Sequence, residues 1–109
     1  MMVIILTTSY IPYGKEKAIA EKYLEIVKKF PVDRSLEKSL IRVAVKATHK
    51  GIKAISATEV KEGKYDEILK RITNMNLIYS DVPGYSYKIE TFISGVDALP
   101  MIGLSMPED

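Results

Sequence analysis

The order of apolar and polar residues along the chain predicts three β-strands directly. The segment Met2–Ser9 is β-branched and apolar on both alternating faces, which is typical of a strand covered on both sides. The segments Leu40–His49 and Tyr85–Ser94 instead alternate strictly. In Leu40–His49 one face carries Ile41, Val43, Val45, Ala47 and His49, and the other Arg42, Ala44, Lys46 and Thr48. Such alternation predicts a strand with one buried face.

Two further segments repeat their apolar residues at helical spacing. The first is Gly14–Phe30, with an apolar stripe of Ile19, Tyr23, Ile26, Val27 and Phe30. Pro31 follows it and predicts its end, because proline cannot continue the hydrogen-bond ladder. The second is Tyr65–Tyr79, with a stripe of Tyr65, Ile68, Leu69, Ile72, Met75 and Tyr79. Acidic residues begin both helices, as the helix dipole favours.

The dipeptide Lys50-Gly51 predicts a hairpin after Leu40–His49, because glycine accepts positive φ angles without steric cost. A two-residue loop at this position would place His49 opposite Ile52. Arg42 would then face Glu59, and this cross-strand pair of opposite charges supports the register. The partner strand is expected over residues 52–60.

The resulting order, β-α-β-β-α-β, predicts the fold class. Two right-handed β-α-β crossovers around a central hairpin give a four-stranded antiparallel sheet with both helices on one face. This is an α+β, ferredoxin-like sandwich. Its first and third strands are expected at the centre and the other two at the edges. Residues 1–95 form the domain, and residues 96–109 follow as a tail.

A sheet covered on one face leaves the other face open. The helices are expected to cover the face with Ile41, Val43, Val45, Ile52, Ala54 and Val60. The open face would show Ala44, Ile55, Ala57, Phe92 and one apolar set from the first strand, rimmed by Arg42, Lys46, Lys53, Glu59, Lys88 and Glu90. A large apolar patch of this kind usually marks an interaction surface. We expect a two-fold homodimer through it, the alternative being a merely solvated amphipathic face.

The tail carries apolar residues with no clear period, namely Leu99, Met101, Ile102, Leu104 and Met106. Two prolines interrupt it, so no regular element is expected. An apolar tail must cover something, and we expect it to pack on its own domain or on a partner subunit.

The element order over residues 2–95 and the step Val82-Pro83-Gly84-Tyr85 into the last strand resemble the dimeric α/β-barrel superfamily. This resemblance is one of pattern and extends over almost the whole chain. It implies two sheets packed face to face and a pocket between sheet and helices. Members include cofactor-independent oxygenases, haem-degrading enzymes, isomerases and ligand-sensing modules, and the fold does not choose among them.

Composition limits the number of domains, the kinds of site and the class of partner that the chain could have. The chain has 109 residues, a net charge of +2 and no cysteine, so it is one domain without disulfides or thiolate zinc sites. The charge is too balanced to favour nucleic acid. No segment predicts a signal peptide or a membrane span, which favours a cytoplasmic location. Glutamine is absent and Lys, Glu and Ile are frequent, a bias that resembles thermophilic proteins.

His49 is the only histidine and so the only side chain that normally titrates near neutral pH. It is the candidate catalytic residue, as a general base or a haem ligand; the alternative is a polar group at a strand end. A lone histidine cannot complete a metal site, so no metal is expected. The glycines fit no phosphate-binding spacing, and no cofactor is expected.

Phenols and strand hydroxyls are the candidate ligand-binding groups. Tyr85 and Tyr87 share one face of the last strand, and Ser56, Thr58 and Thr91 also lie in strands. On the helix-covered face they would make a partly polar cavity that orients a ligand. The alternative is that the tyrosines are core residues and that the threonines reflect β-propensity.

Two functions are consistent with these patterns. The first is a homodimeric module that binds a small apolar or aromatic molecule or a partner protein, which the lack of a catalytic constellation favours. The second is a cofactor-independent oxygenase or isomerase of the dimeric α/β-barrel kind, which would use His49 and the tyrosines on a small aromatic or apolar substrate.

Overall fold

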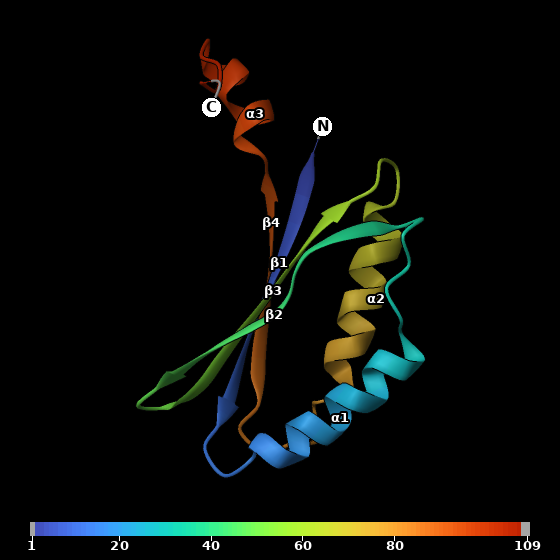
Figure 1. The fold of residues 1–109 in the computed structure, drawn as a ribbon, viewed down its shortest axis with the longest axis vertical. Helices are drawn as coiled ribbons and strands as arrows, with labels where there is room; N and C mark the ends of the chain where they lie inside the picture. The colour runs from blue at the N-terminus through green and yellow to red at the C-terminus, as the bar shows by residue number, and fades with distance from the viewer. Residues whose placement is uncertain (1, 108–109) are drawn as a thin grey trace.

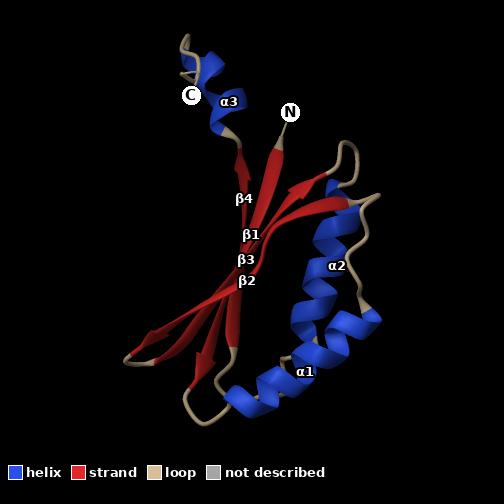
Figure 2. Ribbon diagram, viewed as in Figure 1, coloured by secondary structure: helices blue, strands red, loops and turns tan. Residues whose placement is uncertain are grey.

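A computed structural model describes residues 2–107 of the chain. The elements are β1 (Val3–Pro12), α1 (Glu16–Lys29), β2 (Glu37–Thr48), β3 (Gly51–Val60), α2 (Tyr65–Leu77), β4 (Ser86–Ile93), α3 (Gly95–Ala98) and the 3-10 turn η1 (Leu99–Ile102). The strands form one antiparallel sheet in the order β2-β3-β1-β4. The helices α1 and α2 lie on the same side of it (Figures 1 and 2).

The predicted α+β class and four-stranded antiparallel sheet are therefore confirmed, with β1 and β3 central. The arrangement is compatible with a ferredoxin-like sandwich. Both long helices begin with acidic residues, and α1 ends at Lys29 just before Pro31, as its sequence dictates. The core lies between α2 and the centre of the sheet, where Ile68 is fully buried against Ile5.

The predicted hairpin register is wrong. Thr48 pairs with Gly51, so the two-residue turn is His49-Lys50, and Glu59 lies opposite Lys38 rather than Arg42. The physical reason is at Gly51, where a Cβ atom would collide with the carbonyl oxygen of Ile11 on β1. The glycine therefore serves a close approach of two strands and not the turn.

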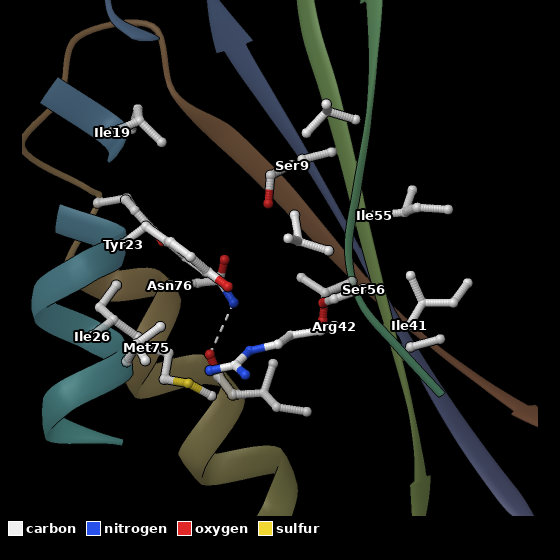
Figure 3. A pocket seen from close by; sticks show the side chains of 18 of the residues that line it. Ser9, Ile19, Tyr23, Ile26, Ile41, Arg42, Ile55, Ser56, Met75 and Asn76 are labelled. Carbon is white, nitrogen blue, oxygen red and sulfur yellow. Dashed lines mark hydrogen bonds between the residues drawn. The ribbon is translucent and has the colours of Figure 1, made fainter. Parts of the chain in front are cut away.

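Strand β2 contains two β-bulges that the alternation did not reveal. Its register with β3 shifts between Ser39 and Ile41 and again between Ile41 and Ala44. Each shift inserts one extra residue into β2, so the side chains that follow point to the opposite face of the sheet from the one expected. Ile41 lies opposite Ala57 on the open face, so its predicted place under the helices is wrong. Arg42, predicted on the open face, points to the helix side (Figure 3).

The open face consists of four cross-strand rows, because directly opposed residues share a face. From one end to the other, the rows are Lys38–Glu59–Ile4–Phe92, Ile41–Ala57–Leu6–Glu90, Ala44–Ile55–Thr8–Lys88 and Lys46–Lys53–Tyr10–Ser86. The middle of the face is mostly apolar, and the charged residues lie along its margins. Lys88 and Glu90 form an ion pair of 3.6 Å on the β4 margin.

The segment after β4 forms α3 and η1, where no regular element was expected. Ser94 caps α3, and the Asp97 carboxylate accepts a hydrogen bond of 2.7 Å from the Met2 amide of β1. The segment extends beyond the end of the sheet (Figure 1). Its apolar side chains remain exposed, with Ile102 at 72% and Val96 at 64%. The last two residues of the predicted tail, 108 and 109, and residue 1 of the predicted domain lie outside the described residues.

Candidate functional site

A cavity of about 410 Å³ lies between the helix side of the sheet and the two long helices. Its walls are mostly apolar. Ile19, Tyr23 and Ile26 from α1 and Met75 from α2 face strands β1, β2 and β3 across it (Figure 3). The volume is within the range of small-molecule pockets in proteins. Ile19 and Ile26 of α1 are buried, while the β2–β3 hairpin diverges from the helices (Figure 1).

A chain of hydrogen bonds joins the sheet to α2 at one wall of the cavity. The Tyr85 hydroxyl donates to Asn76 Oδ1 at 2.8 Å and lies 3.1 Å from Ser9 Oγ. Asn76 Nδ2 in turn donates to the Ile72 carbonyl at 2.9 Å. Asn76 is buried, so these bonds satisfy an amide that would be costly to leave unpaired.

The tyrosines at this wall are neutral phenols. Burial raises the pKa of Tyr85 above its ordinary value, although the hydrogen bond with Ser9 opposes the shift. Burial, together with the neighbouring Tyr85 and Tyr23 phenols, also raises the pKa of Tyr79. The rings of Tyr79 and Tyr85 lie 4.9 Å apart, centroid to centroid. This wall therefore offers uncharged hydrogen-bonding groups and no phenolate near neutral pH.

Three of the predicted ligand-binding residues line the cavity, namely Tyr85, Ser56 and Thr58. The Thr58 hydroxyl donates to the Glu37 carboxylate at 2.9 Å. The other two predicted residues are placed elsewhere: the Thr91 hydroxyl bonds to that of Tyr65 at 2.8 Å, and the Tyr87 ring lies beside Tyr85 at 6.2 Å. Neither is among the residues lining the cavity.

His49 occupies the β2–β3 turn and is exposed. The residues lining the cavity do not include it. Among residues 2–107 the structure shows no group of three or more His, Asp or Glu side chains that could hold a metal ion. Within the same range no helix is long and apolar enough to cross a membrane.

The cavity residues that the sequence reasoning missed include Arg42 and Asn76. Asn76 follows Ile72 by one helical turn, so its position inside an apolar stripe was a signal that could have found it. Arg42 had no such signal, because a bulge and not the residue pattern turns its side chain toward the helices.

Comparison with known proteins defines a fold and not a family. No family model and no curated protein matches the chain. The chain is similar to the de novo designed protein Foldit4, with a TM-score of 0.57 and 11% identity over 86% of this chain and 99% of that one. It is also similar to a tripeptidase from Staphylococcus aureus, with a TM-score of 0.49 and 10% identity over 95% of this chain and 36% of that one. At such identities the likeness to the designed protein concerns the fold alone.

Proposed function

We propose that this protein is a homodimeric module that binds a small apolar molecule in the cavity between its sheet and helices. The observation that carries the proposal is the cavity itself. It has mostly apolar walls and a small number of polar groups, among them Ser9, Tyr85 and Asn76 at one wall, which is the usual composition of a ligand site. Ser9, Tyr85 and Asn76 hold one another in place, so that wall is organised before any ligand arrives.

Binding is favoured over catalysis by the position of His49. A cofactor-independent oxygenase or isomerase would need a base beside its substrate. His49 lies in the hairpin turn, and burial raises the pKa of the Tyr85 phenol at the cavity. The carboxylate of Glu37 is engaged by Thr58. These groups suit recognition of a ligand better than proton transfer.

The open sheet face supports the dimer. Its middle rows place Ile41, Ala57 and Leu6 side by side, and a solvated sheet face would carry polar residues there. Lys46 and Lys53 lie directly opposite each other at one margin, an arrangement that is unfavourable within a single sheet. An acidic residue of a second copy would offset it. A face-to-face pair of sheets is also the arrangement of the dimeric α/β-barrel superfamily.

The exposed segment of residues 95–106 is a second surface available for the partner. Its apolar side chains have no cover in one copy of the chain, and they begin where β4 leaves the sheet. In a dimer through the open face this segment would lie close to the partner's sheet, where burying it would add apolar contact area.

The proposal is tested with the full chain by native mass spectrometry and by binding of an uncharged fluorescent probe, phenylnaphthylamine. We expect a dimer and saturable enhancement of probe fluorescence. Ala54 faces the cavity from β3, so Ala54→Phe should fill it and reduce probe affinity about tenfold or more. Ala47 faces the same side but does not line the cavity, and Ala47→Phe is the matched control.

Each part of the proposal has its own contrary result. A monomer at micromolar concentration would overturn the dimer and leave the cavity in place. Equal probe binding by both phenylalanine variants would show that the probe lies elsewhere, and the cavity would then lose its proposed role.

A further inference from the structure

We infer that the ligand of this cavity is an apolar carboxylic acid whose carboxylate binds Arg42. The inference rests on the proposed binding function and adds the chemical class of the ligand. It comes from the one feature of the cavity that an apolar ligand alone leaves unused, a cation on its β2 wall.

The backbone of β2 places this cation. Ile41 pairs with Ala57 and Ala44 pairs with Ile55, so Arg42 and Val43 together lie opposite the single residue Ser56. A bulge of this kind re-aims a side chain that regular alternation would send to the other face. In Figure 3 the Arg42 side chain extends from the strands toward Asn76 and Met75, whereas Ile41 and Ile55 lie on the far side.

Arg42 has no protein partner within the described residues. The ion pairs found there are Lys22–Asp81, Lys64–Glu67 and Lys88–Glu90, and no hydrogen bond from the Arg42 side chain is present among residues 2–107. A guanidinium carries five N–H donors in a planar fork. Arg42 is exposed, so its donors are open to solvent and to an acceptor that the chain itself does not supply.

The two carboxylates of the cavity wall are already engaged. Glu37 accepts from the Thr58 hydroxyl at 2.9 Å, and Glu16 accepts from the Gly14 amide at 2.6 Å. Neither forms an ion pair with Arg42 among the described residues. Their negative charges repel any anionic ligand, and they repel a dianion such as a phosphate monoester more strongly than a monocarboxylate. A single carboxylate matches the single guanidinium, and its two oxygens fit the fork.

The other walls of the cavity indicate the chemistry of the ligand beyond its carboxylate. Across from Arg42 lie Ile19, Ile26 and Met75, which favour a hydrocarbon body (Figure 3). The polar wall of Ser9, Tyr85 and Asn76 is satisfied internally and needs no further polar group from the ligand. A fatty acid and an aromatic carboxylic acid share this chemistry, with one acidic end and an apolar body.

The test is displacement of phenylnaphthylamine by ligands that share one hydrocarbon chain and differ at the head, namely decanoate, decanol and decyl phosphate. The protein is the full chain as purified. We expect decanoate to compete about tenfold to a hundredfold better than decanol, since hydrogen bonds to charged groups contribute on that scale. Decyl phosphate should compete no better than decanoate.

Arg42→Met should abolish the preference for decanoate over decanol, each compared by its displacement of the probe from the same variant. Arg42→Lys keeps the charge without the fork and should retain an intermediate preference. The matched control is Lys46→Met, which removes a positive charge from the same strand on the open face and should keep the full preference. Urea unfolding of each variant shows that it is folded.

The results that overturn the inference differ from those that overturn the binding function. Equal competition by decanoate and decanol, with the probe still bound, would leave an apolar site and remove the acid. Stronger competition by decyl phosphate would identify a phosphate ligand instead. Failure of the probe to bind the unmodified protein would overturn the proposed function itself.

Discussion

The two halves of this small domain use the same kinds of residues to different ends. Around α2 the apolar stripe closes on the sheet, and Ile68 at its centre is 0% exposed. Around β2 equally apolar residues stay open, with Val45 at 68% and Val43 at 48%. The first half is a packed core that holds the fold, and the second lines the cavity. Apolar surface that the fold does not use is where its function should be sought.

Truncating one residue in each half gives the largest expected contrast. Ile68→Ala should lower the free energy of unfolding by about 2 to 5 kcal/mol, because it leaves a void in the core. Val45→Ala removes side-chain atoms that are already in water and should change the free energy of unfolding by less than about 0.5 kcal/mol. Urea unfolding of both variants measures the two values. A comparable loss at Val45 would mean that the β2 half is closed in solution.

Much of the fold was predictable from residue patterns because each element carries its own period. The strict alternation of Tyr85–Ser94 and the helical stripe ending near Tyr79 are both present in the structure, with boundaries moved by one or two residues. The faces of strand β2 were harder to predict. A bulge adds one residue without changing the composition, so alternation placed Ile41 and Arg42 on the wrong faces.

The residues of the candidate site divide in the same way, into those on regular elements and those that depend on the bulges of β2. Ser56 and Thr58 could be predicted because they lie in β3, whose faces can be counted, and Tyr85 because it directly precedes β4. Arg42 could not, since its direction depends on a shift of register within β2. The hairpin prediction was wrong for a related reason. Gly51 is required by its close approach to Ile11, and such a tertiary contact cannot be recognised from the local sequence.

The open sheet face provides a second contrast, between the middle of that face and an exposed hairpin position. Ala57→Lys places an ammonium in the centre of the proposed interface, where burying an unpaired charge costs several kcal/mol. We expect the dimer dissociation constant to rise at least a hundredfold in sedimentation equilibrium. Ala47→Lys adds the same charge near the turn and should leave the dimer intact. An unchanged dimer in Ala57→Lys would place the interface elsewhere.

The smallest expected effect is a difference in unfolding free energy between variants of two neighbouring tyrosines, Tyr85 and Tyr87. Tyr85→Phe removes the hydroxyl that donates to Asn76 and leaves a buried amide oxygen without its partner. That loss should cost about 1 to 3 kcal/mol of unfolding free energy. Tyr87 has no hydrogen bond from its hydroxyl among the described residues, and Tyr87→Phe should be nearly neutral. Thermal and urea unfolding compare the two. Equal effects would mean that the Ser9–Tyr85–Asn76 chain of hydrogen bonds does not stabilise the cavity wall.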